Sequence, residues 1–357
     1  MNSRERVIAA LEHKEPDILP MQDGIWEAAI NAWHAQGLPR NVKWGSPENY
    51  SFTKYFRFDV ARFGIDLSAR LPERVIEAGK DYNLEVTRDG SVIKRVKDAS
   101  SIIVKNAIGG RNDWEKFKLR LRPEADRFNE KAGNFENFGR AREANKFTAF
   151  YAATGVDRFQ NIVKIDDLLV LMMEDPESAR DMFKTVAQLI IGSCELLRQK
   201  GYAFDGLWLC NDMGYKNASL ISPTLYRELM FKNDKLLCDY AHQTNMKVIY
   251  HSCGYVAELI PDLIEAGVDC LHPLEVKAGM DVVKLKKMYK GKLAFMGGIE
   301  TSRFNSPAEI EEEIAGKLPV AMAGGGYIYH SDHSIPPSVE LKNYLYALET
   351  IRKYGRY

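Results

Sequence analysis

The sequence has few cysteines, no excess of charge of either sign and no long apolar run, and each absence argues against a class of protein. Five widely spaced cysteines without a CxxC pair argue against a disulfide framework and indicate reduced thiols. Because 49 basic residues balance 49 acidic ones and no dense Lys/Arg run occurs, nothing favours a nucleic-acid or membrane-surface partner. No apolar run reaches the roughly 18 residues that a membrane span requires.

The N-terminal segment MNSRERVIAALEHKEPD is charged and has the pattern of an amphipathic helix rather than a signal peptide. Together with the reduced thiols, this predicts a cytoplasmic protein whose partners are small, roughly neutral molecules. The sequence is compatible with a monomer and with a homodimer.

The C-terminal half of the chain repeats one unit, a short apolar run followed by a long amphipathic helix. Six such units follow one another from about residue 146, and their apolar runs are KFTAFYAATG, FDGLWLCNDMG, MKVIYHSCG, VDCLHPLE, LAFMGGIE and GGGYIYHSDHSIPP. Two of the helices begin at Asp175-Pro176 and Ser222-Pro223, where a capping residue precedes proline. Because parallel strands need a crossover, which is usually a helix, the pattern predicts a parallel sheet.

These units predict an α/β protein with the fold of a (β/α)8 TIM barrel, and an open doubly wound sheet is the alternative. The expected first unit is DILPMQDG followed by IWEAAINAWHAQG. Two alternating runs around Asp89-Gly90 indicate a β-hairpin inserted in the N-terminal half, at about residues 82–106 on the barrel rim. No linker divides the chain, so residues 1–357 are expected to form a single domain.

Polar residues gather at the carboxyl ends of the predicted strands. They are Asp23, Asn211, Asp212, His251, Cys253, His272, Glu275, Glu300, His330, Asp332 and His333, and they include four of the seven histidines. In a parallel barrel these ends share the face that holds the active site. We therefore expect Asp23, Trp26 and His330 to line a substrate site there.

His251 and Cys253 form an HxC pair after one strand, and the segment HSDHS places two more histidines and an aspartate after another. A lone HxC pair is more often a satisfied histidine beside a buried thiol, but a second ligand group on the same face favours a metal. Catalytic zinc takes three protein ligands from His, Cys and carboxylate groups. The residues alone leave a zinc site and a plain strand end equally open.

A family resemblance is carried by three stretches, NDMGYKNASLISPTLYRELMFKNDKLLCDYAHQTNMKVIYHSCGYVAELIPDLIEAGVDCLHPLEVKAGMD, FMGGIET and GGGYIYHSDHSIPP. They resemble the uroporphyrinogen decarboxylase superfamily, most strongly from about residue 205 onward, which implies a (β/α)8 barrel. Within it, the chain is similar to the cobalamin-dependent methyltransferases of corrinoid O-demethylase systems. The decarboxylases bind an acidic tetrapyrrole through an arginine-rich RQAGRY loop, whereas the corresponding LPMQDGIWEA has no arginine.

The resemblance implies a zinc site made of an HxC pair and a further cysteine near the last strand. His251 and Cys253 match the pair, and His333 stands in place of the cysteine. The rival third ligands are His330, Asp332 and Glu275. One thiolate and two imidazoles leave zinc with a net charge of about +1, which makes it a stronger Lewis acid than two thiolates would.

Such a metal suits the oxygen of a methyl ether. We expect a zinc-dependent methyltransferase that moves a methyl group from a small methoxylated substrate to the Co(I) corrinoid (cobalamin) of a separate corrinoid protein, since the chain has no evident cobalamin-binding motif. Asp212 and Glu275 are expected to be catalytic, either orienting the ligands or handling the proton of the leaving group.

Three other functions stay open at this point. They are decarboxylation of a less acidic substrate, a non-catalytic role as a corrinoid- or metal-binding accessory protein, and the opposite half-reaction, in which a zinc-bound thiol accepts methyl from cobalamin. The histidine at position 333 favours the ether reaction over the last of these.

Overall fold

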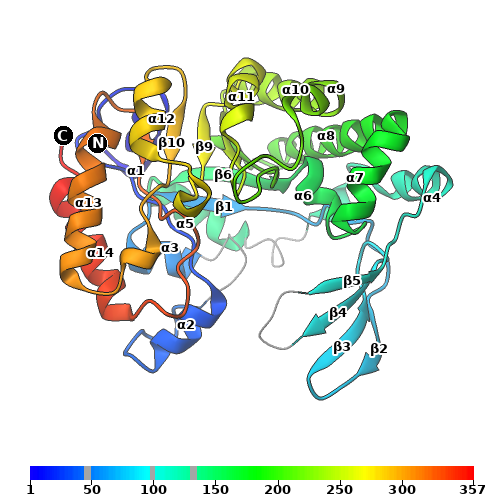
Figure 1. The fold of residues 1–357 in the computed structure, drawn as a ribbon, viewed down its shortest axis with the longest axis horizontal. Helices are drawn as coiled ribbons and strands as arrows, with labels where there is room; N and C mark the ends of the chain where they lie inside the picture. Colours follow the sequence, from blue (N-terminus) through cyan, green and yellow to red (C-terminus); the bar gives the residue numbers. More distant parts are fainter. Residues whose placement is uncertain (44–49, 97–100, 129–134) are drawn as a thin grey trace.

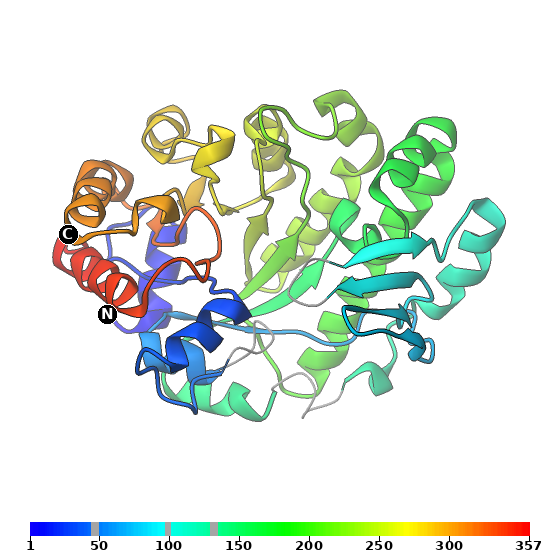
Figure 2. The ribbon, with the colours of Figure 1, turned by 60° about the horizontal axis from the view of Figure 1, so that its bottom comes forward.

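A curled parallel sheet of seven strands forms the centre of the molecule (Figures 1 and 2). The computed structural model describes residues 1–43, 50–96, 101–128 and 135–357. The strands, in their order across the sheet, are β1 (Val60–Phe63), β6 (Phe147–Ala153), β7 (Gly206–Cys210), β8 (Lys247–His251), β9 (Cys270–His272), β10 (Ala294–Met296) and β11 (Tyr327–Ile328). Every neighbouring pair is parallel, so all the carboxyl ends meet at one edge.

The six predicted strand-and-helix units are confirmed, because strands β6 to β11 fall in the six apolar runs. The helices are α1 (Ser3–Leu11), α2 (Glu27–His34), α3 (Tyr50–Phe56), α4 (Arg111–Phe117), α5 (Phe138–Glu143), α6 (Gly155–Phe159), α7 (Ile165–Glu174), α8 (Pro176–Gln199), α9 (Pro223–Leu229), α10 (Phe231–Gln243), α11 (Ile260–Ala266), α12 (Val282–Met288), α13 (Pro307–Met322) and α14 (Leu341–Tyr354). As predicted, the side chains of Asp175 and Ser222 cap α8 and α9. Within the described ranges, no helix combines the length and apolarity needed to cross a membrane.

The segment DILPMQDG, which was expected to be the first strand, forms only isolated bridges and no regular strand. Met21 pairs with Tyr329 in parallel, and the Met21 carbonyl accepts a hydrogen bond of 2.7 Å from the Asp59 amide just before β1. Pro20 has no N–H to donate, which weakens a regular ladder here. The parallel sheet therefore has seven named strands among the described residues instead of the eight predicted, and β1 is a strand that the sequence pattern does not indicate.

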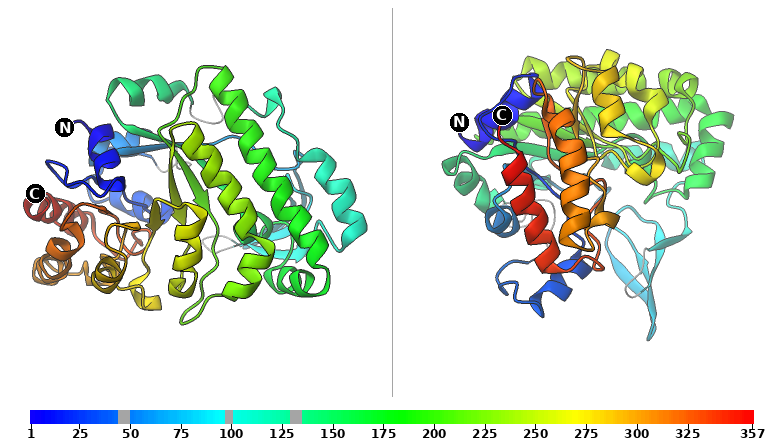
Figure 3. Two further views of the ribbon diagram at one scale, coloured as in Figure 1. Left: turned by 90° about the horizontal axis from the view of Figure 1, so that it is seen from above. Right: turned by 60° about the vertical axis from the view of Figure 1, so that its left-hand side comes forward.

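Alternation along the strands separates an inner face from an outer one. The inner side chains are Val60, Phe147, Ala149, Trp208, Cys210, Ile249, Cys270, Ala294, Met296 and Ile328. Helix α1 packs its apolar side chains against the same cluster, and its residues bond to the chain just before β6 and β11. It thereby covers the amino-terminal end of the sheet interior. Helices α8 and α10 lie side by side along the outer face (Figure 3).

A second sheet, antiparallel and four-stranded, projects from the body of the molecule (Figure 1). Its strands are β2 (Arg74–Ala78), β3 (Tyr82–Val86), β4 (Val92–Val96) and β5 (Ile102–Lys105). Strands β3 and β4 pair across the Asp89-Gly90 turn, where Gly90 has the positive φ of 85° that such a turn requires. The predicted hairpin spans residues 82–106, and residues 97–100 of that range lie outside the described residues. Arg158 of α6 bonds to both oxygens of Asp89, at 2.9 and 3.0 Å, and links this sheet to the main one.

Asp23 joins the two ends of the chain. Its carboxylate is fully buried and accepts hydrogen bonds from the hydroxyls of Tyr329 and Tyr344, each at 3.0 Å, and from the hydroxyl of Ser331. Burial raises the pKa of Asp23 to about 7, although the bonded hydroxyls favour the charged form. The Asp23 carboxylate therefore ties the N-terminal segment to the loop after β11 and to helix α14.

We predict that Asp23→Ala lowers the free energy of unfolding by about 3 kcal/mol, because buried hydroxyls lose their acceptor. Urea unfolding followed by circular dichroism measures this change. Asp239→Ala is the matched control: Asp239 is half exposed and pairs with Lys235 on α10, so the change there should stay below about 0.5 kcal/mol. Equal effects of the two substitutions would contradict the prediction.

Candidate functional site

The register of three parallel strands brings the candidate ligands together. Cys210 at the end of β7 pairs with His251 at the end of β8, and His251 pairs with His272 at the end of β9. Asp212 and Cys253 follow their strands by two residues each. Two segments that are 41 residues apart in the chain therefore end side by side.

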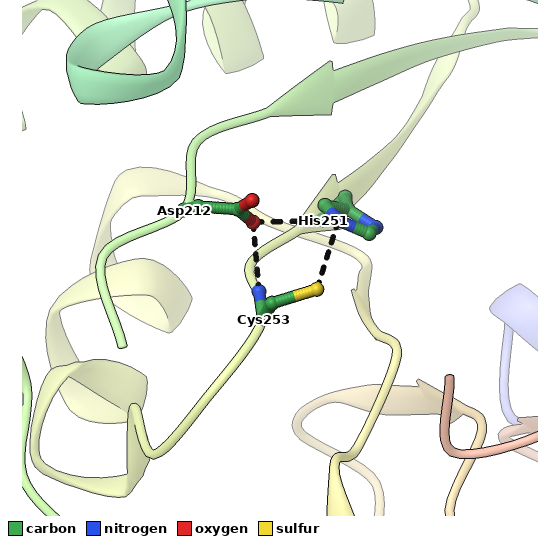
Figure 4. A group of neighbouring side chains, drawn as sticks. All are labelled: Asp212, His251 and Cys253. Carbon is green, nitrogen blue, oxygen red and sulfur yellow. Dashed lines mark hydrogen bonds and ion pairs between the residues drawn. The ribbon is translucent and has the colours of Figure 1, made fainter. Parts of the chain in front are cut away.

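Asp212, His251 and Cys253 form one cluster (Figure 4). The Nε2 atom of His251 lies 3.4 Å from the Cys253 sulfur and 3.4 Å from Oδ1 of Asp212. The Cys253 amide donates to the same Asp212 oxygen at 2.9 Å. One ligand atom from each residue lies within 4.8 Å of the others, and this is the one such group of His, Cys and acidic residues within the described part of the chain.

Electrostatics favour a thiolate in this cluster. Burial acts to raise the pKa of the Cys253 thiol, but the charge of His251 and hydrogen bonds with His251 and His333 lower it below its ordinary value. Burial likewise opposes a charge on His251, but the neighbouring thiols and the Asp212 carboxylate raise its pKa well above the ordinary value. Burial acts to raise the pKa of Asp212, but the bond to His251, the charge of that ring and the bonds with Cys253 together lower it. The lowered pKa of Cys253 favours the deprotonated sulfur that metal binding requires.

His333, the predicted third ligand, reaches the cluster from the loop after β11. Its side chain hydrogen-bonds to Cys253, which raises the pKa of the imidazole. The Trp26 ring stacks on it, with 6.1 Å between ring centres. The structure thus brings His333 to Cys253 and Trp26 to His333, while the tightest group of ligand atoms has Asp212 as its third member.

The rival ligands have other contacts. Glu275 accepts a bond of 2.8 Å from the Gly254 amide and so fixes the loop beside Cys253. Asp332 is buried and accepts from the Thr301 amide at 2.9 Å. His330 is buried too, with Nδ1 2.7 Å from the Ser331 carbonyl oxygen, and burial lowers its pKa to about 3.

The predicted substrate contacts of Asp23 and His330 stay predictions. Both side chains are almost completely buried, and Nδ1 of His330 lies 3.4 Å from Oδ1 of Asp23. Of the three residues predicted to line the substrate site, Trp26 is the exposed one, at 48%.

His272 orients His251 from the next strand. Their Nδ1 atoms lie 2.7 Å apart, so one ring donates to the other. Burial and the charges of neighbouring cationic groups lower the pKa of His272 well below its ordinary value, so its neutral ring accepts from the Nδ1–H of His251. This bond leaves Nε2 of His251 directed at the cluster.

Two residues near the site were not predicted. Asp157, on α6 after β6, is partly buried. Desolvation, followed by the charge of Asp212, raises its pKa to about 6. The rule that polar residues follow strand ends could have identified it. Arg62 lies within β1. This strand has only four residues, and a charged residue among them hides the apolar pattern that would have predicted it.

A family model and solved structures of other proteins resemble this chain to different degrees. The model of the family "Uroporphyrinogen decarboxylase (URO-D)" matches residues 158–354. A methyltransferase from Methanosarcina mazei superposes with a TM-score of 0.68 at 15% identity, over 99% of this chain and 98% of that one. A β-glycosidase from Thermosphaera aggregans gives a TM-score of 0.46 at 11% identity, over 96% and 97% of the two chains. No curated protein sequence matches the chain significantly.

We predict that iodoacetamide alkylates Cys253 at pH 7 at least about tenfold faster than the other four cysteines, because its pKa is lowered and it is partly exposed. Peptide mass spectrometry of the protein in EDTA gives all five rates at once, and the four buried thiols serve as internal controls. His251→Ala should slow the reaction of Cys253. Equal rates for all five thiols would contradict the assignment of a thiolate.

Proposed function

Because the chain belongs to the uroporphyrinogen decarboxylase family, we propose that it is a zinc-dependent methyltransferase, which moves a methyl group from a small methoxylated compound to the Co(I) corrinoid of a partner protein. The observation that carries the proposal is the cluster of a thiol, an imidazole and a carboxylate at the carboxyl ends of β7 and β8. The likeness of the fold to that of the Methanosarcina mazei methyltransferase supports it.

The residues of the cluster fit zinc. Thiolate, imidazole and carboxylate are the ligand types that zinc takes in catalytic sites, and the lowered pKa of Cys253 favours the form that binds. In this proposal Cys253 and His251 hold the metal together with His333 or Asp212. Bound zinc supplies a Lewis acid for the ether oxygen of the substrate.

The other residues around the cluster position the ligands and handle protons. Asp212 fixes the amide of Cys253, and Glu275 fixes that of Gly254. When the methyl group leaves for cobalt, the bond between carbon and oxygen breaks and the oxygen keeps both electrons. A carboxyl group then delivers a proton to that oxygen. Asp157 suits this step, since its pKa of about 6 keeps part of it protonated near neutral pH; Asp212 and Glu275 remain the other candidates.

We predict that purified protein contains about one zinc ion per chain, and that Cys253→Ala and His251→Ala remove it. Elemental analysis measures the content. His242→Ala is the matched control, because His242 is exposed and its Nε2 bonds to Asp269 away from the cluster. Zinc loss in His333→Ala or in Asp212→Asn identifies the third ligand. Full zinc occupancy in both Cys253→Ala and His333→Ala would rule out the site as proposed.

We predict methyl transfer from aromatic or aliphatic methyl ethers to a reduced corrinoid protein, seen as the absorbance change from Co(I) to methyl-cobalt. Cys253→Ala should slow it by more than about 100-fold, as loss of a metal ligand does. Release of CO₂ from a carboxylated substrate without any corrinoid would instead indicate the decarboxylase. Transfer from methylcobalamin to thiols alone would indicate the opposite half-reaction.

A further inference from the structure

Arg62 lies inside the curled sheet. Its neighbours in β1 alternate, with Val60 in the inner cluster and Ala61 and Phe63 in the outer core. Arg62 follows Val60 by two residues and therefore points inward as well. Its guanidinium carbon lies 4.5 Å from the centre of the Trp208 ring and 5.6 Å from that of Tyr151. Since Trp208 precedes Cys210 by two residues on β7, Arg62 lies one layer deeper than His251.

No acidic side chain of the described residues forms an ion pair with Arg62, although the side chain is only partly exposed. The guanidinium lies over two aromatic rings, and its buried Nε has no hydrogen-bond partner. The nearby imidazoles of His272 and His330 supply no negative counter-charge in either protonation state. A charge in the interior without a counter-ion is costly unless a ligand provides one.

Three buried N–H donors around this point have no acceptor within the described residues. They are Nε of Arg62, Nε1 of Trp208 and Nε2 of His272. Arginine and tryptophan nitrogens can only donate. In the tautomer in which Nδ1 of His272 accepts from His251, Nε2 of His272 is a donor as well. The rings of Trp208 and His272 are in contact, with 5.0 Å between their centres, so these donors belong to one region.

We propose that Arg62, Trp208 and His272 form a binding site for a carboxylate group of the substrate, beneath the cluster of Cys253, His251 and Asp212. The inference rests on the proposed function, since the bound molecule is the methyl donor. A planar carboxylate matches the fork of a guanidinium. One guanidinium balances one negative charge, which favours a carboxylate over a doubly charged phosphate. The methyl donor is thus a small methoxylated acid.

The test is isothermal titration calorimetry on the full-length protein with acetate, benzoate and 4-methoxybenzoate, each paired with its neutral amide. Wild type should bind at least one carboxylate more tightly than the corresponding amide. Arg62→Met should weaken the binding of that carboxylate by about 50-fold and leave the affinity for the amide unchanged. Arg62→Lys keeps the charge but loses the two-pronged guanidinium, so its affinity for the carboxylate should lie between those of wild type and Arg62→Met. The control is Arg74→Met, because Arg74 is exposed on β2, and it should bind like wild type.

Two further measurements, zinc content and melting temperature, distinguish a loss of carboxylate binding from a loss of the metal or of the fold. Arg62→Met should keep the zinc content of wild type and should not lower the melting temperature, because it removes a buried charge. Equal binding of every carboxylate and its amide, or wild-type affinity in Arg62→Met, overturns the inference, since water then accepts from these N–H groups or the carboxylate binds elsewhere. A carboxylate preference in a protein without zinc or methyl transfer overturns the proposed function alone. Methyl transfer from neutral and acidic ethers at equal rates overturns the carboxylate site alone.

Discussion

The parallel register of β7, β8 and β9 is the constraint on which the rest of the site depends. It sets His251 between Cys210 and His272, and the loops that follow then place Asp212 beside Cys253. A slip of one residue would turn every side chain of a strand to the opposite face. His251 would then point into the outer core, and neither the cluster nor its contact with the inner histidines would exist. The long amphipathic helices on the outer face fix this register through the hydrophobic core.

Features with local signals could be predicted from the sequence. The six strands from β6 onward were found because each is an apolar run before a helix, and the caps of α8 and α9 because Asp175 and Ser222 precede proline. The pair of His251 and Cys253 was found because strand ends share one face. Strand β1 was not found, since four residues with a central arginine show no clear alternation. The contacts of Arg62 and Asp157 depend on neighbours brought together only by folding.

The identity of the third ligand determines the chemistry that the site can support. With His333, one thiolate is the only anionic ligand, and a bound zinc ion keeps a positive charge that attracts a substrate oxygen. With Asp212, a carboxylate joins the thiolate and the charge of the ion is neutralised. Both side chains interact with Cys253, Asp212 through the Cys253 amide and His333 through the Cys253 side chain, so both are candidates for the third ligand of the proposed zinc site.

The bonds of Asp23 also bear on how the chain folds during synthesis. Its partners Tyr329, Ser331 and Tyr344 lie 306, 308 and 321 residues further along the chain. The N-terminal segment therefore leaves the ribosome long before the donors of these bonds are synthesised, and the Asp23 carboxylate stays hydrated until the last helix emerges. Contacts of such long sequence separation form late and slowly. The first unit of the fold in sequence is thus among the last to be completed in time.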